Sequence, residues 1–81
     1  MQVRVQLFSY LKELAGITDT TEQLPDGATV NDLLARLHGR FPKLAALQKS
    51  TLVAVGVEYA GRDQVLRDGD EVSLFPPVQG G

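Results

Sequence analysis

The chain begins with strict alternation of apolar and polar residues, which is the period of a strand with one face on a core. Val3, Val5 and Leu7 are its apolar positions. A second extended segment is predicted over 17–24, because threonine favours extended backbone and Pro25 disfavours helical angles in the residue before it. This second strand is rather polar, so we expect it at an edge of the sheet.

Two helices are predicted from apolar spacing and from end signals. Ser9 is a candidate N-cap of a short helix, and Gly16 supplies a residue able to take positive φ at its end. Thr29 and Asp32 resemble a capping box at the start of the main helix, and Pro42 prevents that helix from running on. Its apolar stripe, at spacings of three and four, consists of Val30, Leu33, Leu34, Leu37 and Phe41.

Two more strands are predicted in the second half of the chain. Val53, Val55 and Val57 alternate, and Gly56 permits a bulge or a close approach. After a turn at 68–69, the last strand alternates again. One face of this strand should carry Val72 and Leu74, and the other face Glu71, Ser73 and Phe75.

The order strand, strand, helix, strand, strand indicates an α+β fold with one principal helix across a sheet. By analogy with folds of this order, we expect a ubiquitin-like β-grasp. Its mixed sheet would have four to five strands, with the first and last parallel neighbours, and a short helix would accompany the principal one. The length of 81 residues leaves room for one domain. We expect residues 1–75 to form it and residues 76–81 to be a flexible C-terminal tail.

Composition removes several kinds of site from consideration. The absence of cysteine excludes disulfides, thiolate metal sites and thiol nucleophiles. His38 is the only histidine, so a metal site or a Ser-His-Asp triad lacks parts, and we interpret it as a solvated helix residue. There is no Gly-rich phosphate loop or Walker pattern. A self-contained enzyme is therefore the weakest of the candidate functions.

Charge and hydropathy narrow the partners and the location. The formal net charge is -2, and the eight basic residues are scattered, so we expect no nucleic acid as a direct partner. A segment that crosses a bilayer needs about 20 apolar residues, and no apolar run in this chain approaches that length, so we expect no membrane as a partner. The start of the chain carries no export signal, and a cytoplasmic protein is the expectation.

The C-terminal residues form a separate feature. Pro76-Pro77 is a stiff, extended stalk, and Gly80 and Gly81 have no side chains. An active site that acts on a terminal carboxylate through a narrow channel requires backbone without Cβ atoms, and Gly-Gly meets that requirement. The alternative interpretation is an ordinary frayed chain end.

A candidate docking surface lies at the root of this tail. Strand alternation places Phe8 and Phe75 opposite the core positions, on the outer face of the sheet. Exposed apolar area there would suit a protein partner, and Lys12 is a candidate for its rim. In the alternative interpretation, the short helix or a loop covers the two rings and Lys12 is merely solvated.

Three segments, 7–16, 29–34 and 68–81, together resemble the small subunits of molybdopterin synthase, a ubiquitin-like family of sulfur carriers. The Phe-Pro-Pro-x-x-Gly-Gly ending is the most specific part, since thiamine sulfur carriers and ubiquitin also end in Gly-Gly but usually lack the diproline. One departure is Gly56, where the family commonly has asparagine.

The resemblance implies that a ubiquitin-activating-like adenylyltransferase uses ATP to adenylate the Gly81 carboxylate. Sulfur from a donor such as a cysteine desulfurase system would then displace AMP and leave a thiocarboxylate. The tail would enter the large catalytic subunit of molybdopterin synthase and deliver sulfur to a pterin precursor of the molybdenum cofactor. No cofactor or metal would be bound by this chain. The residues implied in carriage and docking are Gly80, Gly81, Phe8, Lys12, Phe75, Pro76, Pro77 and Val78.

Two alternatives stay open at this point. One keeps the fold and the tail but changes the recipient: sulfur for thiamine or for transfer RNA, or attachment of Gly81 to other proteins as a ubiquitin-like modifier. The other is a non-covalent β-grasp adaptor for which the tail is irrelevant.

Overall fold

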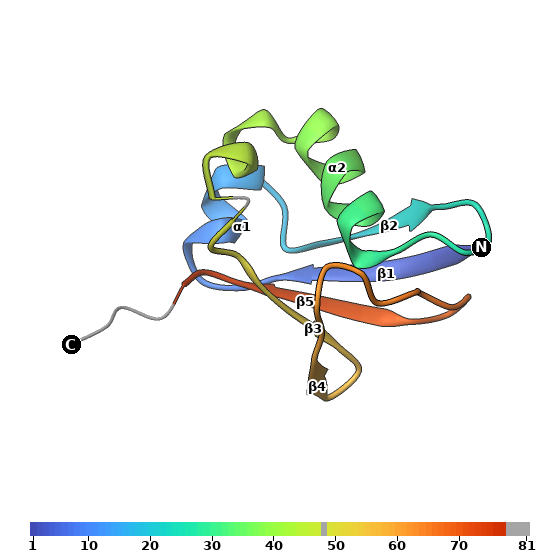
Figure 1. Ribbon diagram of the computed structural model, residues 1–81. Coiled ribbons are helices and arrows are strands. Elements are labelled where there is room, and N and C mark those ends of the chain that lie inside the picture. Colours follow the sequence, from blue (N-terminus) through green and yellow to red (C-terminus); the bar gives the residue numbers. More distant parts are fainter. Residues whose placement is uncertain (48, 78–81) are drawn as a thin grey trace.

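The computed structural model describes residues 1–47 and 49–77. In these residues a five-stranded sheet is covered on one face by helices (Figure 1). The elements in chain order are β1 (Gln2–Leu7), α1 (Tyr10–Ala15), β2 (Asp19–Gln23), α2 (Val30–Arg40), the 3-10 helix η1 (Pro42–Leu47), β3 (Leu52–Val55), β4 (Glu58–Tyr59) and β5 (Glu71–Phe75).

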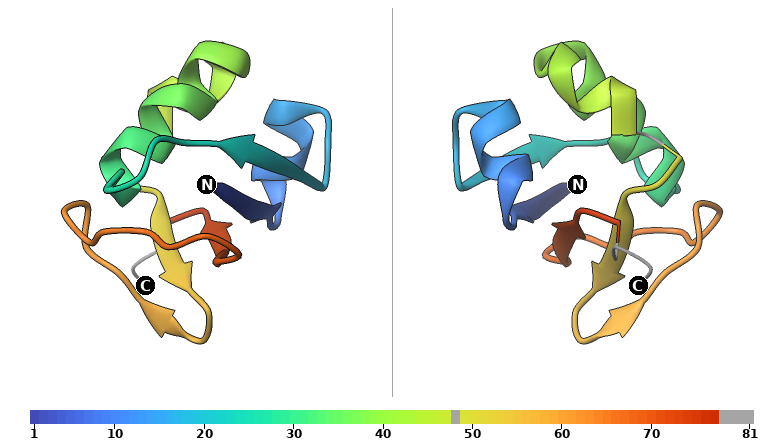
Figure 2. Two further views of the ribbon diagram at one scale, coloured as in Figure 1. Left: turned by 90° about the vertical axis from the view of Figure 1, so that its right-hand side faces the viewer. Right: turned by 90° about the vertical axis from the view of Figure 1, so that its left-hand side faces the viewer.

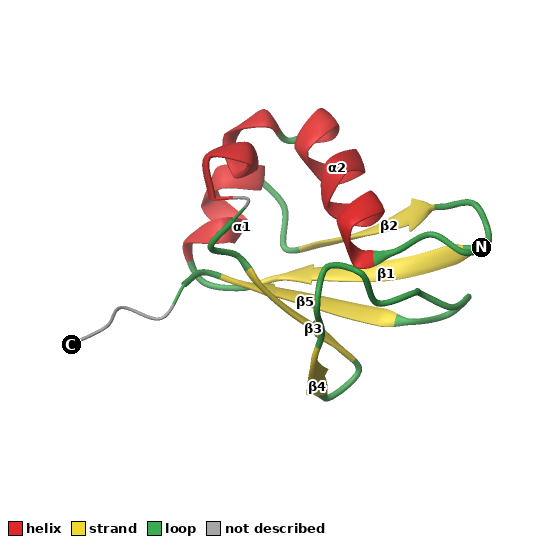
Figure 3. Ribbon diagram, viewed as in Figure 1, coloured by secondary structure: helices red, strands yellow, loops and turns green. Residues whose placement is uncertain are grey.

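The sheet has the strand order β2-β1-β5-β3-β4. β1 and β5, the first and last strands, are parallel neighbours at its centre, and the other pairs are antiparallel (Figure 3). The predicted polar strand, β2, lies at an edge as expected. The prediction of an α+β, ubiquitin-like β-grasp with a mixed sheet is confirmed.

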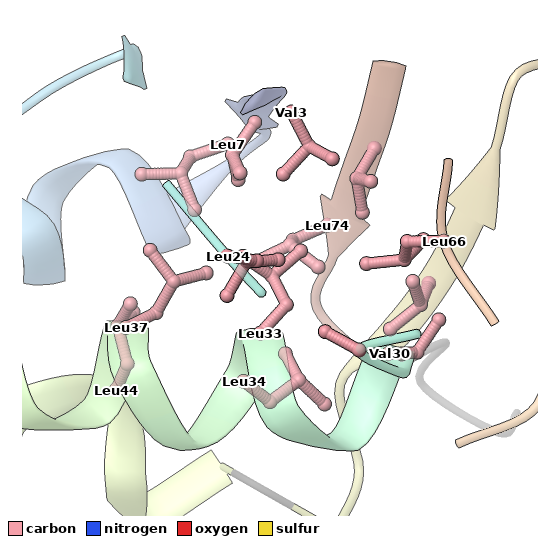
Figure 4. Close-up of a cluster of buried hydrophobic side chains, with 14 of the residues drawn as sticks. Val3, Leu7, Leu24, Val30, Leu33, Leu34, Leu37, Leu44, Leu66 and Leu74 are labelled. Atoms are coloured by element: carbon pink, nitrogen blue, oxygen red, sulfur yellow. The ribbon is translucent and has the colours of Figure 1, made fainter. Parts of the chain in front are cut away.

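The core lies between α2 and the sheet (Figure 4). Four of the five predicted stripe residues of the helix are buried, because their spacing turns them all toward the strands. The fifth, Phe41, is instead the C-cap of α2 and only half-buried. The stripe packs on the inward positions of the central strands, which are Val3, Val5, Leu7, Val53, Val72 and Leu74.

The helix ends agree with the predictions except at Ser9. The capping box of α2 is present: the Asp32 backbone N–H donates to Thr29 Oγ1 at 3.3 Å, and the Thr29 N–H donates to the Asp32 carboxylate at 2.9 Å. Gly16 ends α1 with φ 77. Ser9 stands at the N-cap position of α1 but makes no side-chain cap hydrogen bond, and its φ is 57, so the prediction of a capping serine is wrong.

The predicted strand containing Val57 is also wrong in extent. β3 ends at Val55, and Gly56, with φ 64, reverses the chain into β4. Val57 is 99% exposed at the tip of this hairpin, which extends away from α2 (Figure 2). Glycine and asparagine both tolerate the left-handed region, so glycine at this position serves the turn as well as the family's asparagine.

β5 ends at Phe75, where the predicted domain 1–75 ends. Pro76 and Pro77 follow it outside any strand and are half-buried. The rest of the predicted flexible tail, 78–81, lies outside the described residues, and this division of the chain stays a prediction. Among the described helices, none is long and apolar enough to cross a membrane.

Candidate functional site: an aromatic surface at the root of the tail

The rings of Phe8 and Phe75 stack on each other, with their centroids 4.7 Å apart and their planes 13° from parallel. The sheet register explains the contact, because Leu7 pairs with Leu74 across the parallel β1 and β5 and each phenylalanine is the next residue along. The Phe8 N–H donates to the Leu74 carbonyl oxygen at 3.1 Å and fixes the two strand ends together. Phe8 is 38% exposed and Phe75 is half-buried. The predicted outer-face placement is therefore found.

A third aromatic residue, Tyr59, joins this pair. Its ring meets that of Phe75 edge-on, at a centroid distance of 6.5 Å and an interplanar angle of 66°. Tyr59 is 75% exposed on the edge strand β4. Sequence reasoning missed it, since the two-residue strand that carries it leaves no periodic signal. Phe8, Tyr59 and Phe75 are called the aromatic surface below.

Two hollows flank the aromatic surface. One, of about 210 Å³, borders Tyr59 and Phe75 beside the β3–β4 turn. The other, of about 360 Å³, borders Phe8 where β1 passes into α1. Lys12 and Asp19 also line this second hollow, so the expected rim position of Lys12 beside Phe8 is found. The rim carries one cation and one carboxylate, and the carboxylate of Asp19 accepts a hydrogen bond from Arg4 at 3.0 Å.

The predicted tail residues divide at Pro77. Pro76 and Pro77 directly follow Phe75 in the chain, so the diproline begins at the aromatic surface. Val78, Gly80 and Gly81 lie outside the described residues. Their roles in carriage and docking stay predictions.

The described residues contain no cluster of three or more histidine, cysteine, aspartate or glutamate side chains that would hold a metal ion. His38 lies on α2, as expected, and its side chain is half-buried and so only partly solvated. Burial lowers the pKa of His38 below its ordinary 6.5, and the charge of Arg62 lowers it further. His38 therefore favours its neutral form in the folded chain.

A family model described as the ThiS family matches residues 5–81. The chain belongs to the ThiS family. Among curated members, it is 39% identical to the molybdopterin synthase sulfur carrier subunit of Chlamydomonas reinhardtii, with 100% of both chains covered. The resemblance indicated by the sequence motifs is confirmed.

Solved structures share the architecture of this ThiS-family chain. The small archaeal modifier protein 1 of Haloferax volcanii superposes with a TM-score of 0.89 at 31% identity, covering 100% of both chains. A second solved structure is the complex of subunits 1 and 2 of molybdopterin-converting factor from Helicobacter pylori. One chain of that complex superposes with a TM-score of 0.73 at 27% identity, covering 100% of both chains.

Proposed function

We propose that this chain is the sulfur carrier subunit of a molybdopterin synthase and that Gly81 carries the sulfur. The observation that carries the proposal is the full-length similarity to a relative named as such a subunit, which includes the C-terminal region. The aromatic surface beside the diproline supports it, because a carrier needs a place to dock where its tail begins.

The carrier chemistry takes place on the Gly81 carboxylate. A carboxylate is a poor acyl donor, so its oxygen first attacks the α-phosphorus of ATP, releases pyrophosphate and forms a mixed anhydride with AMP. Sulfide-level sulfur then attacks the carbonyl carbon, and the bond to the AMP oxygen breaks, so AMP leaves. If the donor is a protein persulfide, this attack gives an acyl disulfide, and a thiol reductant cleaves its S–S bond to leave the thiocarboxylate. One oxygen of the carboxylate has been replaced by sulfur. The ATP is used by a ubiquitin-activating-like enzyme, the sulfur comes from a donor such as a cysteine desulfurase system, and this chain binds no cofactor.

The large catalytic subunit is the proposed recipient of the tail, and the aromatic surface is the proposed contact. Exposed aromatic rings bury large apolar area at little entropic cost and are frequent anchors of interfaces. Lys12 would lie at the polar rim, and Pro76, Pro77 and Val78 would aim Gly80 and Gly81 into the partner's active site. The two-subunit complex among the structural relatives supports a partner of this kind.

In this arrangement the chain is not an enzyme by itself. The large subunit would supply the catalytic side chains, the pterin precursor would be its substrate, and this chain would deliver the sulfur. Such a reaction belongs in the cytoplasm, where ATP and the sulfur donor are available.

The deciding experiment is the intact mass of the purified chain after incubation with ATP, its activating enzyme and a sulfur source. The expected result is the replacement of one oxygen by one sulfur, mapped to Gly81 and absent without ATP. No mass change with a demonstrably active enzyme would contradict the proposal. A chain lacking Gly80 and Gly81 tests the non-covalent adaptor, which would keep full activity without them.

A second candidate function is protein modification, and the close superposition on the archaeal modifier protein favours it. A modifier would appear in cell extracts linked through Gly81 to lysines of other proteins. Deleting it would leave the pterin precursor at its normal level. A sulfur carrier for molybdopterin instead makes the precursor accumulate on deletion, so one deletion strain separates the two. The same strain identifies a carrier for thiamine or transfer RNA, since only the affected product would disappear.

A further inference from the structure

Ser9 has an unusual backbone conformation. With φ 57 and ψ -141, it is the only residue other than glycine with positive φ among those the structure describes. These angles are the mirror image of the extended polyproline II region. Glycine and D-residues enter this region freely, whereas the Cβ of an L-residue is strained there.

The side chain of Ser9 does not explain this conformation. It is exposed, and its hydroxyl makes no cap hydrogen bond to α1. The backbone around it is held from both sides instead. The Phe8 N–H donates to the Leu74 carbonyl at 3.1 Å, and the Lys12 N–H donates to the Ser9 carbonyl at 3.1 Å. The Leu11 N–H donates to the Phe8 carbonyl at 3.2 Å. Strain persists where the surroundings determine the backbone in this way.

The strand register turns Phe8 outward, and the turn at Ser9 keeps it there while the chain returns to the core. Leu7 and Leu11 are both core residues, 2% and 1% exposed, so the chain leaves the core and returns to it within four steps. An unstrained turn has to change the direction of one of these residues or of Phe8. In the observed turn, both leucines stay in the core and the Phe8 ring faces outward against Phe75.

We infer that Ser9 is a positioning residue: its strained backbone holds Phe8 in the stacked geometry in which the aromatic surface meets the partner. The inference rests on the proposed docking of that surface to the large subunit. A ring held in its bound position before the encounter loses less conformational freedom on binding, which strengthens the complex. The strain at Ser9 lowers the stability of the free chain, and the Phe8 ring is held in its bound position.

The test compares Ser9→Gly, Ser9→Ala and a semisynthetic chain that carries D-serine at position 9. Each is assayed for thermal unfolding, for affinity to the molybdopterin synthase large subunit by calorimetry, and for nuclear Overhauser contacts between the Phe8 and Phe75 rings. Glycine relieves the strain but frees the backbone. We expect Ser9→Gly to keep or raise the melting temperature, weaken the ring contacts and lower the affinity about two- to fivefold.

The other two chains are the matched controls. Ser9→Ala keeps the strain and removes the hydroxyl, so wild-type affinity is expected. D-serine relieves the strain without freeing the backbone, so it should raise the melting temperature and retain both the ring contacts and the affinity. A structural turn with no role in docking would change the melting temperature of Ser9→Gly and leave its affinity at the wild-type value. A lowered affinity of Ser9→Gly at an equal or higher melting temperature, with the affinity restored by D-serine, identifies the positioning role.

Two results would overturn the inference, and they are distinguishable. Wild-type affinity and ring contacts in Ser9→Gly, alongside weakened binding of Phe8→Ala, would remove the role of Ser9 and leave the docking surface standing. Wild-type affinity in Phe8→Ala as well would remove the docking function on which the inference rests.

Discussion

The carboxylate of Glu22 accepts a hydrogen bond from the guanidinium of Arg40, which joins the edge strand β2 to the last turn of α2. Glu22 is 5% exposed on the helix-facing side of the strand, whereas Arg40 is 46% exposed. The Arg40 guanidinium also lies 5.0 Å from the centroid of the Phe41 ring. The positive charge of Arg40 at the C-terminal end of α2 interacts favourably with the helix dipole. The Glu22–Arg40 pair also neutralises the buried carboxylate and holds this end of the helix over the sheet.

Replacing Arg40 by methionine should therefore destabilise the fold. Arg40→Met leaves the Glu22 carboxylate buried without its cation, and we expect a loss of about 2–3 kcal/mol, below the value for a fully buried pair because Arg40 is half in solvent. The measurement is the free energy of unfolding from urea titration.

The exposed pair Arg4–Asp19, 3.0 Å apart, provides the matched control for Arg40→Met. Arg4→Met should cost about 1 kcal/mol or less, because both side chains are solvated. Similar losses in Arg4→Met and Arg40→Met would contradict the structural role of the buried pair.

The sequence predicted the elements whose signals are local. The stripe and capping box of α2, the alternation of β1 and β5 and the polar edge strand depend on neighbouring residues, and each was found. The burial of Glu22 was not predictable in this way, because it depends on Arg40, 18 residues away. A strand pattern alone does not indicate that a helix end supplies a cation above it.

The errors in the second half of the chain have the same origin. The alternation of Val53, Val55 and Val57 carries no information on chain direction, and the positive φ of Gly56 reverses the chain before Val57. The short strand that follows places Tyr59 on the aromatic surface. The outward positions of Phe8 and Phe75 were predictable from strand alternation. The position of Tyr59 depends on a hairpin, and the alternating pattern did not show that β3 and β4 are two strands.

His38 should make stability depend on pH. Its pKa is lowered from 6.5 in the folded chain by burial and by Arg62, so the unfolded chain binds the proton more tightly. Stability contributed by the neutral side chain is fully present above the unfolded-state pKa of 6.5 and is lost as the pH falls through the lower folded-state pKa. We expect the free energy of unfolding to fall as the pH drops below the ordinary histidine pKa of 6.5, and the decrease to be smaller in His38→Gln. Since the chain has one histidine, an equal decrease in both proteins would contradict the assignment.

Tyr59→Ala should separate docking from stability. The tyrosine is 75% exposed and lies at a sheet edge, so its loss should change the free energy of unfolding by about 0.5 kcal/mol or less. Its ring contributes to the aromatic surface, and truncation should weaken binding to the large subunit about tenfold. Calorimetric titration measures the affinity.

Val65→Ala is the control for Tyr59→Ala, because Val65 is also exposed, at 55%, but lies beside Thr29 and outside the aromatic surface. Equal weakening by both variants would remove Tyr59 from the interface.

Gly81→Ala should abolish most carrier activity and leave the fold unchanged. Among the residues that the structure describes, Leu74 is the last in the buried core, and a methyl group added to Gly81 leaves every one of those core side chains in place. At the reacting carboxylate, however, a Cβ atom displaces the carbonyl carbon within any channel that fits only glycine backbone, and misplacement of reacting atoms lowers rates on the order of a hundredfold. Thiocarboxylate formation followed by intact mass, together with the melting temperature, measures both effects. Gln79→Ala is the control, since it shortens a side chain near the terminus without adding an atom. Full thiocarboxylate formation and sulfur delivery by Gly81→Ala would show that the absence of a side chain at the terminus is not required, and the Gly-Gly ending would lose its physical explanation.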